Sequence, residues 1–279
     1  MVPTMKHTVL VVGLGEVGSA LYQMILESGR FEVYGYDTDE TRTKHRYKEI
    51  PRPIDYLHVC YPYTPEFIET TLNYIWDFRP KLTIIHSTVP VGITEMIESS
   101  IRDKSYIVHS PVRGKHPKLL AHLHFWTKWI GGNNSRAVQL AVQHLQDIGF
   151  EVKCFSSSKT SELAKLVETT YRAWMIVYWQ EIHRWTYHDS IDLVEVFEFI
   201  REVHEVLKDR PIYYPDVIGG HCLIPNTTLL LSSYPTEVAE LILNSNLKRE
   251  EEIEDENIRR DVERLKEYWR HQCEHWYYT

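Results

Sequence analysis

Long apolar runs are missing from this sequence of 279 residues. No stretch approaches the roughly 18 apolar residues of a membrane-spanning helix, and the run at 9–12 is too short for a signal peptide. Cysteine is scarce: Cys60, Cys154, Cys222 and Cys273 lie far apart without a C-x-x-C pair, which argues against disulfides and a structural zinc site. We therefore expect a cytoplasmic protein with no membrane partner.

Positive charge is also in deficit. The 31 Lys and Arg residues face 39 Asp and Glu residues, a net charge of −8, which argues against nucleic acid as a partner. Histidine is plentiful, but no H-E-x-x-H or comparable ligand spacing occurs, so we expect no catalytic metal. At about 150 residues per domain, the chain has room for two domains and not for a third.

The first 155 residues alternate short β-rich runs with helical patterns, which predicts βαβ units and a parallel sheet. The expected strands are 8–12, 32–36, 56–60, 82–86, 106–110, 128–130 and 151–155. A linker at 156–158 then precedes a long helix that begins at Thr160 or Ser161. We predict a Rossmann-type, doubly wound α/β domain at 1–155 and a mostly α-helical second domain at 156–279.

Two further patterns mark the second half. Asp189 and Ser190 are expected to cap a helix that ends near Leu207. The tail at 248–270 is dense in charge, yet four apolar residues fall four, three and four positions apart, as in a short coiled-coil seam: Ile258, Val262, Leu265 and Trp269. The stripe either packs on its own domain or contacts another subunit.

A glycine-rich motif follows the first expected strand and opens a helix. It is G-x-G-x-x-G at 13–18, where Gly13 permits a tight turn, Gly15 lets the backbone approach a pyrophosphate, and Gly18 lets helix and strand pack closely. The start of the helix offers free N–H groups to an anion. The expected cofactor contacts here are Gly13, Gly15, Glu16, Val17 and Gly18.

Asp37 lies 19 residues after Gly18, at the end of the second expected strand. A carboxylate there accepts hydrogen bonds from both ribose hydroxyls and repels a 2′-phosphate, which favours NAD over NADP. FAD and S-adenosylmethionine sites share parts of this pattern. Alternatively, the glycine-rich turn binds nothing, or Asp37 is a helix cap before Thr38.

Four further segments occur in the order 86–92 (H-S-T-V-P-V-G), 110–113 (S-P-V-R), 161–166 (S-E-L-A-K-L) and 219–225 (G-G-H-C-L-I-P). Together with the glycine motif, they resemble the UDP-glucose/GDP-mannose dehydrogenase family. The resemblance implies an enzyme that oxidises a sugar-nucleotide alcohol to a carboxylate with two NAD.

Cys222 lies in a glycine-rich loop beside His221, where backbone N–H groups and an imidazole favour the nucleophilic thiolate. The resemblance implies that this cysteine captures an aldehyde as a thiohemiacetal, and that Gly219, Gly220 and His221 border the substrate. A cysteine that merely lines a pocket or the core is the alternative.

Lys165 and Thr88 join Cys222 in the expected catalytic group. An ammonium at Lys165 stabilises a developing alkoxide, and the resemblance implies that Thr88, at the carboxyl edge of the sheet, orders a water molecule. We expect both to meet Cys222 at the domain interface. The alternatives are a surface lysine and a turn cap. Further expected cofactor contacts follow the third and fourth strands: Tyr61, Pro62, Thr64, Ser87 and Thr88. The segment at 61–65 is alternatively a plain turn.

Three positions depart from the family pattern. Val112 replaces a glutamate, Thr169 an asparagine, and Asn226 an aspartate, and an asparagine cannot serve as a base near neutral pH. We keep Thr169 as a substrate contact and Asn226 in the catalytic group. The departures favour oxidation of an alcohol to an aldehyde over the full four-electron conversion.

The substrate is expected to be small or sugar-like and anionic. Family members carry a further C-terminal domain that binds the nucleotide sugar, and only 57 residues follow Cys222, from 279 minus 222. The basic cluster of Arg113, Lys115 and His116 suits a carboxylate or phosphate, although a solvated loop is the alternative.

Three functional hypotheses remain open. The first is the NAD-dependent oxidoreductase just described, the second a two-electron β-hydroxyacid-type dehydrogenase, and the third a catalytically reduced NAD-binding sensor or assembly protein.

The helix at 161–187 resembles the dimer-forming connector of the family, and its aromatic residues predict a homodimer: Trp174, Tyr178, Trp179 and Trp185. Substrate identity and reaction direction stay open.

Overall fold

The computed structural model describes residues 6–101 and 105–270, so Cys273 lies outside the described residues. The chain divides into two compact units, Met1–Lys165 and Leu166–Thr279. Among the described residues, no helix is both long and apolar enough to cross a membrane.

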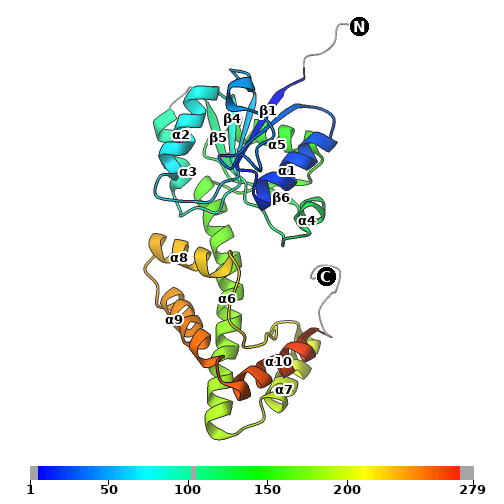
Figure 1. Cartoon of the computed structure of the whole chain (residues 1–279), viewed down its shortest axis with the longest axis vertical. Helices are drawn as coiled ribbons and strands as arrows, with labels where there is room; N and C mark the ends of the chain where they lie inside the picture. The colour runs from blue at the N-terminus through cyan, green and yellow to red at the C-terminus, as the bar shows by residue number, and fades with distance from the viewer. Residues whose placement is uncertain (1–5, 102–104, 271–279) are drawn as a thin grey trace. The chain divides into compact units, whose positions relative to one another are not determined.

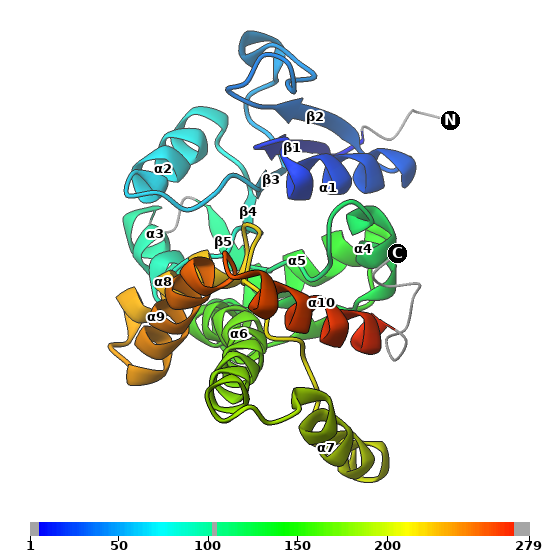
Figure 2. The ribbon, with the colours of Figure 1, turned by 60° about the horizontal axis from the view of Figure 1, so that its bottom comes forward.

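The first unit is a five-stranded parallel sheet covered by helices on both faces (Figures 1 and 2). Its strands are β1 (Thr8–Val12), β2 (Glu32–Tyr36), β3 (Tyr56–Val59), β4 (Leu82–Ile85) and β5 (Tyr106–His109), in the order β2-β1-β3-β4-β5. The predicted doubly wound α/β fold is confirmed. The last two expected strands, β6 (Lys128–Ile130) and β7 (Val152–Cys154), form a separate two-stranded parallel sheet.

The two faces of the sheet carry separate apolar clusters. Val9 and Val11 face one cluster, with α1 (Glu16–Glu27), α4 (Leu119–Phe125) and α5 (Ser135–Ile148). Leu10 and Val12 face the other, with α2 (Phe67–Phe78) and α3 (Ile93–Ile101). Residues 9–12 are almost completely buried, as expected for a central parallel strand with both faces covered.

The order of the strands places a switch point at β1. The chain moves from β1 to β2 on one side and then returns to place β3 on the other side of β1. Ligands of doubly wound sheets bind outside the carboxyl ends of the strands at such a point. The short 3₁₀ helix η1 (Tyr47–Glu49) lies on the return path.

The second unit consists of helices: α6 (Ser158–Asp189), whose first turns belong to the first unit, α7 (Leu193–Leu207), α8 (Leu223–Ser233), α9 (Glu237–Glu252) and α10 (Glu256–Arg270) (Figure 1). The expected first residues of two helices, α6 and α7, were wrong. Helix α6 begins at Ser158, inside the expected linker. Asp189 and Ser190 end α6, with Ser190 at φ 55°, whereas Asp192 caps α7 by accepting from the Val194 N–H at 2.7 Å.

The charged C-terminal stripe packs on its own unit. Val262 and Leu265 are buried, and Leu265 joins an apolar cluster with Trp179 and Phe197. The Trp269 indole Nε1–H donates to the backbone oxygen of Ile212 at 2.9 Å. The structure therefore supports the intradomain interpretation of this seam.

Candidate functional site

The glycine motif forms a tight loop between β1 and α1. Gly13 has φ +85°, and a Cβ atom there would lie 2.6 Å from the Tyr61 nitrogen. A Cβ atom on Gly18 would overlap the carbonyl oxygen of Gly13. Gly15 precedes the first helical residue, Glu16, and caps α1 without a side chain. The loop therefore presents backbone N–H groups at the start of a helix, at the switch point of the sheet.

Asp37 lies beside this loop, directly after β2. Its Oδ2 accepts from the Leu14 N–H at 2.6 Å, and its Oδ1 accepts from the Asp39 N–H at 2.9 Å. The carboxylate is therefore fixed at the edge of the glycine loop. Arg42, which no motif in the sequence marks, lies close by: its Nη1 is 3.8 Å from a Cβ built on Gly15, and its Nε pairs with Asp39 at 3.1 Å.

The loops after β3 and β4 contact each other. The Ser87 hydroxyl donates to the Tyr61 backbone oxygen at 2.6 Å, and the Tyr61 hydroxyl bonds to Thr71 at 2.7 Å. Burial raises the pKa of Tyr61. The Thr64 backbone oxygen accepts a hydrogen bond from the N–H of Phe67, the first residue of α2, at 3.0 Å. Pro62 lies between Tyr61 and Thr64 in the same loop. The structure thus joins the loops after β3 and β4 to each other and places Tyr61 against Gly13 of the glycine motif.

We call residues 86–92 the Thr88 loop. Thr88 is half-buried in it, and Lys165, also half-buried, lies on the first turns of α6 within the same unit. The positive charge of Lys165 contributes to lowering the pKa values of His109 and Lys128. Lys165 therefore lies close enough to interact electrostatically with the last residue of β5 and the first residue of β6.

Lys128 is a buried lysine that no sequence motif marks as a site residue. Its side chain is 3% exposed, and Nζ donates to the backbone oxygens of Ser110 and Pro111 at 2.7 and 2.9 Å. Burial lowers its pKa to about 7, and the charges of Lys165 and Arg113 act in the same direction. A lysine inside an expected strand was the signal available in the sequence.

The expected basic cluster is spread over separate contacts. The Arg113 guanidinium lies 4.6 Å from the ring centre of Trp126 and donates to the Thr127 backbone oxygen at 2.6 Å. The Lys115 backbone N–H donates to His122 at 2.9 Å, and the His116 ring lies 3.8 Å from Glu16. Val112, which replaces the glutamate of the family, is buried in the core.

The second unit holds the cysteine loop. Cys222 is exposed and lies immediately before α8, and Gly220 has φ +82°. Gly219, Gly220 and His221 are exposed as well. The start of a helix stabilises negative charge, which suits a thiolate. The predicted meeting of Cys222 with Lys165 and Thr88 stays a prediction, since these residues belong to different units.

Two of the departures from the family pattern contact each other. The Asn226 amide Nδ2 donates to the Thr169 hydroxyl at 3.2 Å, and both side chains are buried. The Asn226 backbone N–H donates to the Cys222 oxygen at 2.9 Å, one helical turn earlier. The pair is uncharged, so position 226, where the family has an aspartate, supplies a hydrogen bond and no acid or base.

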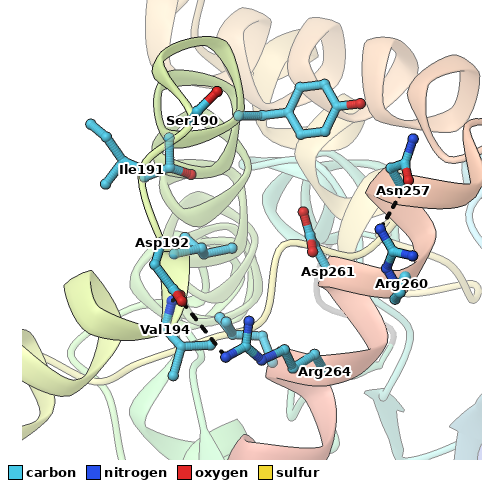
Figure 3. Close-up of a pocket in the computed structure, with 12 residues that line it drawn as sticks. Ser190, Ile191, Asp192, Val194, Asn257, Arg260, Asp261 and Arg264 are labelled. Atoms are coloured by element: carbon cyan, nitrogen blue, oxygen red, sulfur yellow. Dashed lines mark hydrogen bonds and ion pairs between the residues drawn. The ribbon is translucent and has the colours of Figure 1, made fainter.

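A separate cavity of about 660 Å³ lies in the second unit between the end of α6, the start of α7 and α10 (Figure 3). Arg264 faces Asp192 at 3.7 Å across it, and Arg260 donates to Asn257 at 2.9 Å. None of the motif residues lines this cavity. In the part of the chain that the structure describes, no group of three His, Cys, Asp or Glu side chains is arranged to hold a metal ion.

Three comparisons with known proteins bear on identity. Residues 159–249 match the model of the UDP-glucose/GDP-mannose dehydrogenase family, central domain. The UDP-N-acetyl-D-mannosamine dehydrogenase of Methanocaldococcus jannaschii is 26% identical over 261 residues, which cover 77% of this chain and 59% of that protein. The UDP-glucose 6-dehydrogenase of Campylobacter jejuni is 24% identical over 208 residues, with 71% and 51% covered. This chain therefore spans little more than half the length of these relatives.

Solved structures share the fold. The UDP-D-ManNAc dehydrogenase of Pyrococcus horikoshii superposes with a TM-score of 0.77 at 20% identity, covering 87% of this chain and 68% of that chain. A 3-hydroxyisobutyrate dehydrogenase of Mycobacterium tuberculosis gives 0.68 at 16% identity, covering 88% and 94%. The matched central domain and the named relatives confirm the resemblance predicted from the motifs: residues 159–249 match the central domain of the UDP-glucose/GDP-mannose dehydrogenases, and most of this chain is similar to proteins named as dehydrogenases of sugar nucleotides.

Proposed function

We propose that the protein is a cytoplasmic NAD-dependent oxidoreductase that acts on a hydroxyl of a small or sugar-like anionic substrate. The observation that carries this proposal is the gathering of the glycine loop, Asp37 and the Tyr61–Ser87 contact at the switch point of the first unit. The named dehydrogenase relatives support the reaction class.

The residues at the switch point fit a dinucleotide. The open side of Gly15 and the N–H groups that begin α1 suit a pyrophosphate. The fixed carboxylate of Asp37 suits an unphosphorylated ribose. When bound, NAD supplies the hydride acceptor, and the residues that would border it are the two loops after β3 and β4.

The proposed catalytic roles follow from chemistry. Lys165 stabilises the developing alkoxide, Thr88 positions water or the reacting hydroxyl, and Cys222 is the candidate nucleophile toward an aldehyde. The anionic part of the substrate is assigned to Arg113, Lys115 and His116, with Gly219, Gly220 and His221 at the cysteine loop.

A two-electron reaction is the second candidate. Val112 is buried in the apolar core, and Asn226 is hydrogen-bonded to Thr169, so these positions supply no carboxylate to assist hydrolysis of a thioester. In this version Cys222 lines the pocket without forming a covalent bond, and the substrate resembles a β-hydroxy acid.

Turnover on a defined panel tests the proposal. We expect NAD, and not NADP, to be reduced with UDP-N-acetyl-D-mannosamine, UDP-glucose or 3-hydroxyisobutyrate, monitored by the absorbance of the reduced nicotinamide. Lys165→Ala should lower the rate at least 100-fold, because a developing charge loses its partner. Two NADH per substrate, lost in Cys222→Ser, support the covalent route, and one NADH with an active Cys222→Ser supports the second candidate.

Two outcomes would contradict both enzyme candidates. Tight NAD binding without turnover on any substrate favours an NAD-binding sensor or assembly protein. An unchanged melting temperature at saturating NAD removes the cofactor site itself, because a ligand that binds the folded state must stabilise it.

We also propose a homodimer as the working form. An exposed apolar stripe runs along α6, with Val167, Tyr171, Tyr178 and Trp185 each 47 to 59% exposed. The spacing of four, seven and seven residues keeps them on one face of the helix. Trp179, expected in this stripe, packs instead in the core of the second unit.

A further inference from the structure

Buried polar contacts join the first turn of α6 to the Thr88 loop. Ser161 and Glu162 are completely buried, which is unusual for a glutamate. Both lie on the part of α6 that belongs to the first unit. A buried carboxylate persists only where it is well hydrogen-bonded, so its partners indicate what it does.

His109 bridges the Thr88 loop and α6. Its Nε2 lies 3.1 Å from the Ser87 backbone oxygen, which only accepts, so we assign the ring proton to Nε2. Its Nδ1 lies 2.9 Å from the Ser161 hydroxyl and accepts from it. Burial lowers the pKa of His109 to about 3, which keeps the ring neutral with one donor and one acceptor, as the two contacts require.

Glu162 makes a second bridge. Its Oε2 accepts from the Gly92 N–H at 2.6 Å, and its Oε1 accepts from the Thr94 N–H at 2.8 Å. These amides lie at the start of α3, at the end of the Thr88 loop, so a carboxylate from one helix caps another. Burial raises the pKa of Glu162, and both backbone bonds oppose that rise.

Both bridges start on the helical face that carries Lys165. Residues three and four positions apart on a helix are neighbours, so Glu162 and Ser161, three and four residues before Lys165, anchor its own turn. The Thr88 loop is held at both ends, at Ser87 by His109 and at Gly92 by Glu162. A rotation of this turn about the helix axis breaks both sets of bonds.

We propose that His109 and Glu162 are positioning residues that hold Lys165 at a fixed place relative to Thr88. The proposal rests on the proposed function, in which these two residues act on the reacting hydroxyl. Small displacements of a catalytic group lower a rate strongly even when binding is unchanged. Neither positioning residue needs to touch the substrate.

Matched variants test the two bridges. His109→Leu and Ser161→Ala remove the first bridge, whereas His109→Gln keeps one hydrogen-bond donor and one acceptor. Glu162→Gln weakens the second bridge, because one carboxylate oxygen becomes an NH₂ group that faces a backbone N–H. The control is Lys159→Ala, on the turn of α6 that also carries Ser161. It removes an exposed ion pair between Lys159 and Glu95 of α3.

The first readout is steady-state turnover on the active substrate of the panel. We expect kcat to fall at least tenfold in His109→Leu and Glu162→Gln and severalfold in Ser161→Ala, with the KM for NAD changed less than twofold. His109→Gln should recover most of kcat, and Lys159→Ala should retain it. Equal losses in Lys159→Ala, or no recovery in His109→Gln, would overturn the proposal.

The second readout does not need turnover. Acetic anhydride labelling followed by peptide mass spectrometry gives the reactivity of Lys165 relative to exposed Lys153 in the same sample. We expect this ratio to change at least threefold in His109→Leu and Ser161→Ala, and to return in His109→Gln. An unchanged ratio in both overturns the positioning role, whereas an absence of turnover in the wild type overturns only the proposed function.

Discussion

At the scale of single residues, we expect Lys128 to make the stability of the protein depend on pH. A lysine in water has a pKa of about 10.5, and burial lowers that of Lys128 to about 7 in the folded state. Between these values the unfolded chain binds more protons, so the contribution of Lys128 to the free energy of unfolding rises with pH. Below pH 7 the cost of burying the charge is fully present. Lys128→Met should therefore gain stability relative to the wild type at pH 7, and this gain should shrink by roughly 3 kcal/mol at pH 9.5.

Urea unfolding at the two pH values measures this difference. Lys153→Met is the control, because Lys153 is an exposed lysine on the neighbouring strand β7. Its stability difference from the wild type should not vary with pH. A gain in Lys128→Met that stays constant from pH 7 to pH 9.5 would show that Lys128 is buried without a lowered pKa.

Residue types in a motif could be predicted from the sequence, but their distant partners could not. The glycine loop, Asp37 and Ser87 gather as the motifs indicate, because each follows a strand whose end is fixed by the topology. By contrast, His58 contacts His86 at 2.9 Å and His144 at 2.8 Å, across 28 and 86 residues of sequence. Such contacts between buried side chains arise from packing of helix on sheet, for which a single sequence carries no spacing signal.

At the scale of elements, the turn between β1 and α1 separates structural from binding requirements. A Cβ atom on Gly18 overlaps the Gly13 carbonyl and lies 3.1 Å from Cys60, whereas one on Gly15 meets only Arg42, at 3.8 Å. Gly18→Ala should lower the free energy of unfolding by roughly 2 kcal/mol or more, since backbone must move. Gly15→Ala should lower the free energy of unfolding by no more than about 1 kcal/mol, because alanine is a poorer N-cap than glycine. It should weaken NAD binding at least tenfold, because the methyl group occupies the path of the pyrophosphate.

Thermal unfolding without NAD and calorimetric titration with NAD measure the two effects separately. Each variant is the control of the other, because both add one methyl group to the same turn. If Gly15→Ala bound NAD as tightly as the wild type does, the pyrophosphate would not approach the backbone at this turn.

The ends of helices were predicted less well than their existence. Apolar spacing located α6 and α7, yet Ser158 begins α6 and Asp192 caps α7. Several polar residues precede each of these helices, and local sequence does not rank them as caps. In α6 the choice is made by tertiary bonds, since Ser158 donates to the side chain of Asn133 at 3.3 Å.

At the scale of the whole molecule, the exposed apolar stripe on α6 is the surface that a homodimer should bury. Tyr178 and Trp185 are both about half exposed and contact each other edge to face, with ring centres 6.4 Å apart. Tyr178→Glu combined with Trp185→Glu should convert a dimer to a monomer in light scattering at about 10 µM, because charged side chains would be buried at the centre of the interface. The double variant should lose no core packing, because both residues are exposed, so its melting temperature should not fall for that reason.

Phe199→Glu on α7, at a 74% exposed position, is the control and should leave the mass unchanged. A monomeric wild type rejects the dimer, and a monomer from Phe199→Glu alone would move the interface to α7.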